Sequence, residues 1–160
     1  MSNIIKALPG SEGIVYDITQ NTIRAVYPHY YPAGAVEFFC QHHSMENILR
    51  DIESGEVWLL YTQTGVPAGT VTVNGNEINR LFVLQKFQGN GYGRILMDFA
   101  EELVSQSFDS AELSASLPAK QIYISRGYKT VSYNIIDASD GDKLCYDYMV
   151  KHFVSKGGTE

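Results

Sequence analysis

The sequence is poor in the features of a secreted, membrane-spanning or nucleic-acid-binding chain. Its two cysteines in 160 residues, Cys40 and Cys145, form neither a CxxC pair nor a metal-ligand spacing. We therefore expect buried, reduced thiols and no metal site. The net charge is −6 without a basic run, which argues against a nucleic-acid partner. No apolar stretch approaches membrane-spanning length, and Ile4-Ile5 is too short for a signal peptide core. These absences predict a soluble, cytoplasmic protein without a membrane partner.

The apolar content, in contrast, is sufficient for a folded domain. Hydrophobic residues make up 44% of the chain, which suits one globular domain with a sizeable core. We expect this domain to cover residues 1–154 and a short C-terminal tail to follow over 155–160.

The most informative segment is a glycine-spaced loop between an apolar strand and an amphipathic helix. Gly89, Gly91 and Gly93 stand at alternate positions, and glycine lets a backbone approach a ligand closely because it carries no Cβ. The helix places its apolar residues at helical spacing: Leu96, Phe99, Ala100, Leu103 and Val104. Its unpaired first N–H groups and partial positive charge favour a phosphate or pyrophosphate ligand.

Residue spacing in this loop distinguishes between phosphate-binding motifs. A dinucleotide fingerprint would need glycine where Arg94 or Leu96 stands, and a P-loop would need Gly-Lys-Ser/Thr where the chain has Gly93-Arg94-Ile95. The loop instead reads Gln88-Gly89-Asn90-Gly91-Tyr92-Gly93. It resembles the Arg/Gln-x-x-Gly-x-Gly/Ala motif of the GNAT superfamily, the acyl-CoA-dependent N-acyltransferases.

The expected order of elements extends this resemblance over most of the chain. Strands are expected over residues 2–7, 57–62, 68–73, 77–83, 111–115, 129–136 and 144–150. Helices are expected from 11 or 17 to 28, then over 35–41, 44–53, from 93 onward, and over 118–126. The resemblance implies an α/β (α+β) GNAT fold, with a mixed, mostly antiparallel central sheet of six or seven strands and about four flanking helices. It also implies that the fourth and fifth strands splay apart, with pantetheine in the gap.

The resemblance implies acetyl-CoA as the acyl donor and a set of residues that contact it. These are Phe82, Val83, Gln88, Gly89, Asn90, Gly91, Tyr92, Gly93, Arg94 and Ser116. For Phe82 and Val83 the backbone N–H groups would act, while their side chains belong to the core. Gln88 could instead brace the loop, and Arg94 could be a surface arginine, although a cation in the first helical turn is unfavourable unless an anion binds. Ser116 replaces a frequent family Asn and offers fewer hydrogen-bonding groups.

Acetyl transfer from a thioester needs a proton for the departing thiolate. Tyr123 is the candidate acid, because Ala119-x-x-x-Tyr123-x-x-x-Gly127-Tyr128 resembles a GNAT stretch whose tyrosine hydroxyl lies near the CoA sulfur. The alternative is an ordinary aromatic residue on a half-buried helix.

The reaction also needs a neutral amine, and Glu77 is the candidate base. It precedes Val83 by six residues, where some GNAT members place a catalytic glutamate. Strand alternation would put Glu77, Asn79, Leu81 and Val83 on one face. A solvated glutamate at the start of a strand fits the sequence equally well.

Aromatic residues and histidines gather around the first helices, the region that shapes the acceptor pocket in GNAT proteins. They are Tyr27, Tyr30, Tyr31, Phe38 and Phe39, with His29, His42 and His43. We expect Tyr31 or Phe38 to form a pocket wall, and we expect no metal on the histidines.

The sequence therefore predicts an N-acetyltransferase that moves an acetyl group from acetyl-CoA to a primary amine by direct attack in a ternary complex. The acceptor would be a small molecule or a peptide. The alternatives are a non-catalytic acyl-CoA-binding sensor and a nucleotide-binding module of another class. A homodimer is possible through the strand over 144–150, whose apolar residues alternate.

Overall fold

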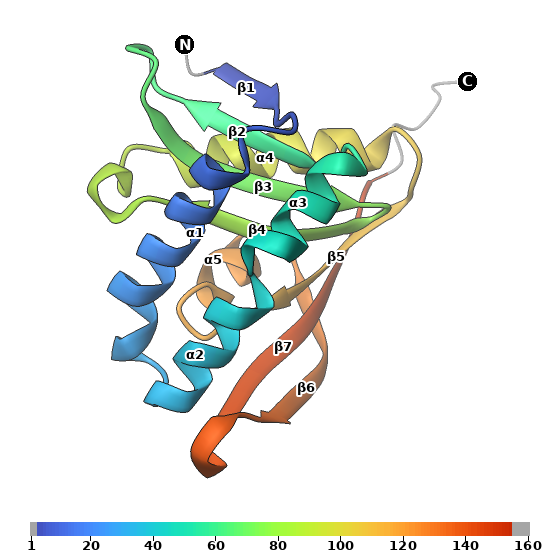
Figure 1. Cartoon of the computed structure of the whole chain (residues 1–160). Coiled ribbons are helices and arrows are strands. Elements are labelled where there is room, and N and C mark those ends of the chain that lie inside the picture. The colour runs from blue at the N-terminus through green and yellow to red at the C-terminus, as the bar shows by residue number, and fades with distance from the viewer. Residues whose placement is uncertain (1–2, 155–160) are drawn as a thin grey trace.

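The computed structural model describes residues 3–154, whose strands form one seven-stranded sheet in the order β1-β2-β3-β4-β5-β7-β6 (Figure 1). The strands are β1 (Asn3–Lys6), β2 (Val57–Tyr61), β3 (Pro67–Asn74), β4 (Glu77–Val83), β5 (Ser110–Ala115), β6 (Lys129–Asp137) and β7 (Lys143–His152). All neighbouring strands are antiparallel except β4 and β5, which are parallel. The expected mixed, mostly antiparallel sheet is confirmed. The expected tail, 155–160, and residue 2 of the first expected strand lie outside the described residues.

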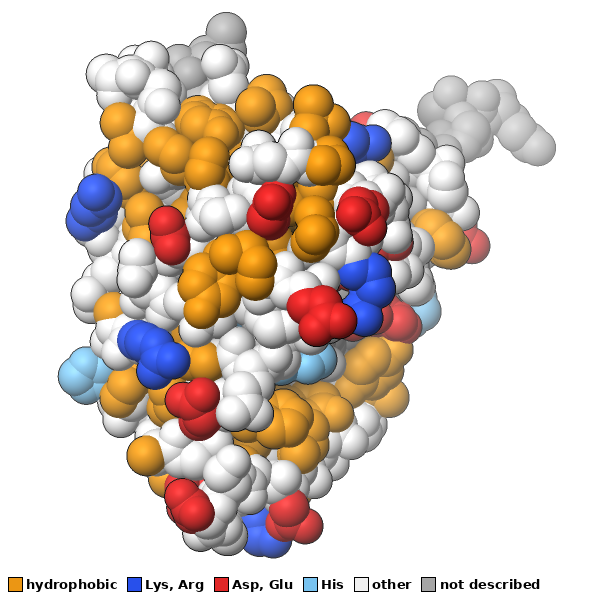
Figure 2. Space-filling model, viewed as in Figure 1, with side chains coloured by type: hydrophobic (Ala, Val, Ile, Leu, Met, Phe, Trp, Pro, Cys, Tyr) orange, Lys and Arg blue, Asp and Glu red, His pale blue; other side chains and the backbone are white. Residues whose placement is uncertain are grey.

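Helices cover both faces of this sheet (Figure 1). They are α1 (Glu12–Val26), α2 (Ala33–His42), α3 (Met45–Glu53), α4 (Tyr92–Ser105) and α5 (Lys120–Ser125), with short 3-10 turns η1 (Tyr27–His29), η2 (Gln85–Phe87) and η3 (Ser139–Gly141). Helices α1, α2 and α3 lie on one face, while α4 and α5 pack on the other. Over the first face, Figure 2 shows acidic and basic side chains interspersed, without a continuous patch of either sign.

Local sequence signals explain where several of these helices begin and end. The Ser44 hydroxyl caps α3 by accepting a hydrogen bond from the Asn47 N–H at 3.2 Å, as serine does at many helix starts. Helix α1 ends at Val26 and passes into η1, because Pro28 has no backbone N–H to donate to a continuing α-helix. Helix α5 begins at Lys120, two residues later than expected, because Pro118 and Ala119 form the turn before it.

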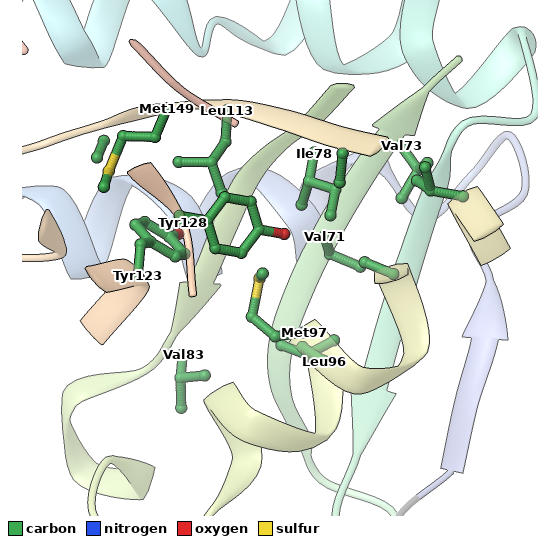
Figure 3. Close-up of a cluster of buried hydrophobic side chains, with 14 of the residues drawn as sticks. Val71, Val73, Ile78, Val83, Leu96, Met97, Leu113, Tyr123, Tyr128 and Met149 are labelled. Atoms are coloured by element: carbon green, nitrogen blue, oxygen red, sulfur yellow. The ribbon is translucent and has the colours of Figure 1, made fainter. Parts of the chain in front are cut away.

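Each face of the sheet has its own hydrophobic core. The core under α4 contains Leu96, Met97, Leu113 and Met149, all almost fully buried (Figure 3). Helix α4 packs closely on β3, since a Cβ at Gly69 would lie 2.9 Å from Leu96 Cδ1. The core under the first three helices holds buried isoleucines and valines, among them Val15, Ile18, Ile23, Ile48 and Ile52. Burying one such side chain contributes about 1.5–3 kcal/mol, so both cores hold the site-bearing strands firmly.

Strands β4 and β5 separate soon after they meet. Glu77 and Glu112 are their one registered pair among the described residues, and the Glu112 N–H donates to the Asn76 carbonyl at 2.9 Å. Toward Val83 and Ala115 the two strands are no longer paired. The gap between them is the one that the family resemblance implied, and it positions the candidate site.

A β-bulge in β4 overturns the expected alternation of its side chains. Arg80 has a φ of +45°, and the pairing with β3 shifts register opposite it, between Thr70 and Thr72. A bulge inserts one unpaired residue and changes which face the later side chains meet. Leu81 and Val83 therefore pack with the α4 core, as Ile78 does before the bulge, so Glu77 and Asn79, which flank Ile78, lie on the opposite face. The prediction that these four residues share one face was wrong.

The hairpin of β6 and β7 corrects two further expectations. Cys40 is buried, but Cys145 is exposed, so the prediction of two buried thiols was wrong for Cys145. In the register of β6 and β7, Cys145 stands opposite Ile135, whose side chain is 68% exposed. The rest of the described chain therefore covers this face of the hairpin incompletely. Strand β7, suggested as a dimer interface, is paired on both edges by β5 and β6.

Candidate active site

Two cavities meet where β4 and β5 separate. The first, of about 670 Å³, lies beside the glycine loop between α1, α4 and α5, and we call it the loop cavity. The second, of about 500 Å³, lies between α2, α3, β4 and β7, and we call it the histidine cavity because His42 and His43 line it. Residues that line both cavities mark the meeting point: Tyr27, Leu81, Phe82, Ser116, Ala119 and Tyr123.

The glycine loop forms one wall of the loop cavity. Gly89 and Gly91 have φ values of +82° and +83°, in the left-handed region that other residues rarely adopt. Gly91 is the N-cap of α4, so the first N–H groups of that helix start at this wall. The lining includes Gln88, Gly89, Gly91, Tyr92, Gly93 and Arg94. Asn90, expected with them, instead lines a shallow hollow beside Phe87 and the β2–β3 turn.

The polar side chains of the loop have separate positions. The Gln88 amide donates to the Val83 carbonyl at 2.9 Å, so Gln88 braces the loop against the end of β4. Arg94 lines the cavity and is exposed, and within residues 3–154 it forms no ion pair. Its guanidinium and the helix N–H groups therefore give this wall the positive character that a pyrophosphate needs.

The strand register determines which backbone amides of β4 face the gap. The Leu84 N–H donates to the Ala68 carbonyl at 2.9 Å, and antiparallel pairing alternates between bonded and non-bonded positions. The alternation turns the Phe82 N–H toward β3 and the Val83 N–H toward the gap. The Val83 carbonyl already points away from β3, toward Gln88. Of the two amides expected at the site, that of Val83 faces the gap, whereas Phe82 contributes its side chain.

Tyr123 lies at the meeting point of the cavities. It is 9% exposed, and its ring stands edge-on to Tyr128 with centroids 5.8 Å apart (Figure 3). Burial raises the pKa of its hydroxyl to about 12, so the phenol keeps its proton at neutral pH. Within the described part of the chain, this hydroxyl forms no hydrogen bond. It is also not one of the fully enclosed oxygens that lack a partner there, which are Thr19 Oγ1 and Tyr128 OH. The Tyr123 hydroxyl is therefore open to the cavities.

Tyr27 and Ser116 form a polar contact across the gap. The Tyr27 hydroxyl donates to Ser116 Oγ at 3.2 Å, which joins the end of α1 to the turn after β5. Burial raises the pKa of Tyr27 above its ordinary value. Sequence reasoning missed this contact, because the two residues are 89 positions apart.

The two aromatic residues expected as a pocket wall have different positions. Phe38 lines the histidine cavity. Tyr31 lines neither cavity; its hydroxyl accepts from the Leu117 N–H at 2.7 Å and donates to the Cys145 carbonyl at 3.0 Å. Tyr31 thus ties the segment between η1 and α2 to the turn before α5 and to β7, and supports the site from outside.

A buried arginine organises the histidine cavity. The Arg80 guanidinium contacts Asp51 Oδ2 at 2.8 Å, Thr72 Oγ1 at 3.1 Å and His43 Nδ1 at 3.1 Å. Burial lowers the pKa of Arg80, and the hydrogen bond to Asp51 opposes that shift. The ion pair keeps the strained bulge of β4 attached to α3. Sequence reasoning missed this residue, since its partners come from distant segments.

Glu77 lines the same cavity, on the same strand as the bulge. Its side chain is exposed, and it stands opposite Glu112, whose carboxylate accepts a hydrogen bond from the Tyr148 hydroxyl. Within residues 3–154 Glu77 has no ion-pair partner. A carboxylate in this position is accessible to a cationic amine that enters the cavity.

Within residues 3–154, no group of three or more His, Cys, Asp or Glu side chains is placed to hold a metal ion. In the same part of the chain, every helix is too short or too polar to cross a membrane.

Solved structures share this fold over nearly the whole chain. A GCN5-related N-acetyltransferase from Rhodopseudomonas palustris matches with a TM-score of 0.85 and 22% identity, over 96% of each chain. PaiA N-acetyltransferase from Thermoplasma acidophilum, solved in complex with coenzyme A, matches with a TM-score of 0.70 and 14% identity, over 96% of this chain and 99% of its own. A GNAT-family acetyltransferase from Listeria monocytogenes matches with a TM-score of 0.71 and 19% identity, over 95% of each chain. None of the curated proteins compared with the chain matches it.

The seven-stranded sheet and the glycine loop at the start of α4 are those of the GNAT class of acetyltransferases. The family model of the acetyltransferase (GNAT) domain matches residues 26–139, and the chain belongs to this family. It is an acyl-CoA-dependent acetyltransferase, and acetyl-CoA is its acyl donor.

Proposed function

We propose that the enzyme transfers an acetyl group from acetyl-CoA to a primary amine of a small molecule or peptide, by direct attack in a ternary complex. The meeting of the two cavities at Tyr123 carries this proposal. Two substrates bound in separate cavities would face each other at this point, so no acylated enzyme residue is needed. Holding two reactants together in this way lowers the barrier of a bimolecular step.

The loop cavity fits the donor. The α4 N-terminus, the left-handed Gly89 and Gly91, and Arg94 provide N–H donors and positive charge for a pyrophosphate. The gap between β4 and β5 gives room for the extended pantetheine arm, beside Ser116 and Ala119. When bound, acetyl-CoA supplies an activated acyl thioester.

Residues that line the two cavities would perform three tasks. The Val83 N–H donates to the carbonyl oxygen as negative charge develops there. Tyr123, which is protonated at neutral pH, donates its proton to the departing thiolate. Glu77, in the histidine cavity, accepts a proton from the incoming ammonium directly or through water.

Replacing Tyr123 tests the assignment of the acid. In Tyr123→Phe we expect kcat to fall by about 10²–10⁴ because the thiolate loses its proton donor, while the Kd for CoA stays unchanged. A screen of primary amines with detection of the free thiol measures turnover, and calorimetry measures CoA binding.

Tyr128→Phe is the matched control. Tyr128 is also a buried tyrosine, and it packs on Tyr123, but it lines neither cavity. We expect it to keep full turnover. Equal rates in wild type and Tyr123→Phe would remove Tyr123 from the mechanism, and CoA binding without turnover of any amine would favour the acyl-CoA sensor instead.

The compartment and the assembly are part of the same proposal. Both cysteines are free, which supports a reducing compartment such as the cytoplasm.

The edge strand β6 exposes Val131, Tyr133 and Ile135 to 63%, 75% and 68%, which supports a homodimer formed through this strand. Light scattering on the purified enzyme would measure the mass, and a monomer at all concentrations would exclude the dimer.

A further inference from the structure

The contact between Arg80 and His43 determines the protonation of the His43 ring. Arg80 Nε lies 3.1 Å from His43 Nδ1, and a guanidinium has only donors. His43 Nδ1 must therefore be the unprotonated, accepting nitrogen. A neutral imidazole in which Nδ1 accepts carries its hydrogen on Nε2. Burial and the nearby Arg80 charge both lower the pKa of His43 and keep the ring neutral.

The position of the His43 ring is fixed on several sides. The backbone carbonyl of His43 accepts a hydrogen bond from the Gln20 side-chain amide at 3.0 Å, and the backbone N–H of His43 donates to the Phe39 carbonyl at 3.2 Å. The ring stands edge-on to Phe82, with centroids 5.6 Å apart, and to His42, with centroids 5.0 Å apart. The direction of the Nε2–H group is thereby fixed before any ligand arrives.

This Nε2–H group has no partner in the described part of the chain. His43 is 8% exposed and lines the histidine cavity. Nε2 is not among the fully enclosed polar atoms that lack a partner, which within residues 3–154 are Thr19 Oγ1 and Tyr128 OH. Nε2 is therefore open to the cavity that His43 lines, as a fixed, neutral donor without an acceptor.

We propose that His43 is a specificity-determining residue whose Nε2–H donates to an oxygen of the acceptor substrate. This inference rests on the proposed function. It names the acceptor class as primary amines that carry a carbonyl or carboxylate oxygen close to the nitrogen, as amino acids and peptides do. Alkylamines and polyamines, which lack such an oxygen, would leave the donor unpaired, and buried groups left unpaired are the basis of strong discrimination.

The contact between His43 and Phe82 supports an oxygen near the amine. The His43 ring contacts Phe82, and Phe82 lines both cavities beside Tyr123. The amine at the meeting point and the oxygen at His43 are thus separated by about one aromatic side chain. Phe38, Phe39 and Tyr146 line part of the cavity, with polar residues such as Asn47 and Arg50 elsewhere in its lining, and this aromatic part suits an apolar or aromatic side chain on the acceptor.

The test compares three acceptors that differ only in the oxygen-bearing group: phenylalaninamide, phenylalanine and phenethylamine. We expect wild type to prefer the first two over phenethylamine by at least about tenfold in kcat/KM. The relative rates of the amide and the acid then identify carbonyl or carboxylate as the partner. A preference for phenethylamine would overturn the proposal.

Two variants of His43 locate this preference. Leucine removes the donor, whereas glutamine can accept from Arg80 and still donate into the cavity. We expect His43→Leu to lose at least about tenfold more kcat/KM for phenylalaninamide than for phenethylamine, and His43→Gln to recover most of that difference. Equal losses for the two acceptors, with no rescue by glutamine, would reduce His43 to a structural residue.

Two binding measurements need no turnover and keep this test separate from that of the proposed function. Side-chain ¹H–¹⁵N spectra of CoA-loaded enzyme should show His43 protonated at Nε2 alone, with a shift of that signal when phenylalaninamide is added. Calorimetry on the same complex should show tighter binding of phenylalaninamide than of phenethylamine. If no amine is acetylated, the proposed function fails, while a ring protonated at Nδ1 or equal affinities would overturn the role of His43.

Discussion

The loop cavity and the histidine cavity are built in different ways. One wall of the loop cavity comes from a single segment of the chain, between Val83 and Arg94, and three of its lining residues are glycines. The histidine cavity is assembled from side chains of α2, α3, β4 and β7. Its central contact joins Arg80 to Asp51 and to His43, which stands 37 positions away.

Under the proposed function, the difference corresponds to what each cavity would recognise, CoA in the loop cavity and the amine acceptor in the histidine cavity. A diphosphate can be bound by N–H groups at a helix start, and side chains matter little there provided that the backbone can turn. An amine acceptor has to be distinguished from other amines, and such discrimination requires side chains at fixed positions. Substitutions should therefore impair binding in the loop cavity when they change the backbone conformation, and in the histidine cavity when they remove a side-chain donor or acceptor.

The largest expected effect comes from the backbone of the loop cavity. Gly91 has a φ of +83°, and valine in place of glycine would change the local backbone, because a β-branched residue is strained there. If three N–H contacts to the diphosphate are lost, at about 1.4 kcal/mol each, CoA affinity falls about 1,000-fold. Calorimetric titration of Gly91→Val with CoA measures this loss.

Gly65→Val is the matched control, because Gly65 has nearly the same φ, +82°, in the turn between β2 and β3. Neither glycine has an atom within 4 Å of an added Cβ. Both variants should lose stability by about 1–3 kcal/mol in urea unfolding, but only Gly91→Val should lose CoA affinity. Normal CoA binding by Gly91→Val would show that the loop amides do not hold the donor.

A smaller effect is expected from the chemistry of the histidine cavity. In Glu77→Gln the ammonium loses its proton acceptor, and kcat/KM should fall about 100-fold at neutral pH. The deficit should shrink as the pH approaches the pKa of the amine, because the substrate then arrives already neutral. A profile of kcat/KM against pH for variant and wild type measures both features.

Glu112→Gln serves as the control for Glu77, since Glu112 is its register partner on β5 but lines neither cavity. We expect its activity to stay within about twofold of wild type. If both glutamines behave alike, the base is another group or water, and the acceptor cavity supplies shape and hydrogen bonds only.

The same contrast explains how much could be predicted from the sequence. The fold and the loop wall depend on local signals, such as the Ser44 cap and the spacing of Gly89, Gly91 and Gly93, and the strands and helices lie close to their expected positions. The β4 bulge could not be predicted, because Arg80 adopts its positive φ with support from Asp51, a partner on the distant helix α3. Long-range contacts of this kind leave no periodic pattern in the sequence.

The long-range contacts missed by the sequence also include Tyr27 with Ser116. The local signals that did apply still left errors of detail. Asn90 belongs to the motif by spacing, yet its side chain folds back to donate to the Phe87 carbonyl at 3.0 Å. Cys145 has apolar neighbours in sequence but lies on the uncovered face of the β6–β7 hairpin.

The smallest expected effect is a pH dependence of stability that belongs to the histidine cavity alone. His43 has a pKa well below its ordinary value because of burial and the positive charge of Arg80, with His42 and Asp51 as the other titratable groups facing this cluster. Above about pH 6.5 neither the folded nor the unfolded chain protonates this ring, so its contribution is complete. As the pH falls further, the unfolded chain binds a proton that the folded chain does not, and the free energy of unfolding drops by up to about 1.4 kcal/mol per pH unit.

Urea unfolding at pH 7.5 and 5.5 should show a smaller drop in His43→Gln than in wild type, whereas His29→Gln, at an exposed histidine, should follow wild type. An equal drop in all three proteins would mean that Arg80 does not hold His43 neutral, and the histidine cavity would lose the fixed donor that distinguishes it from the loop cavity.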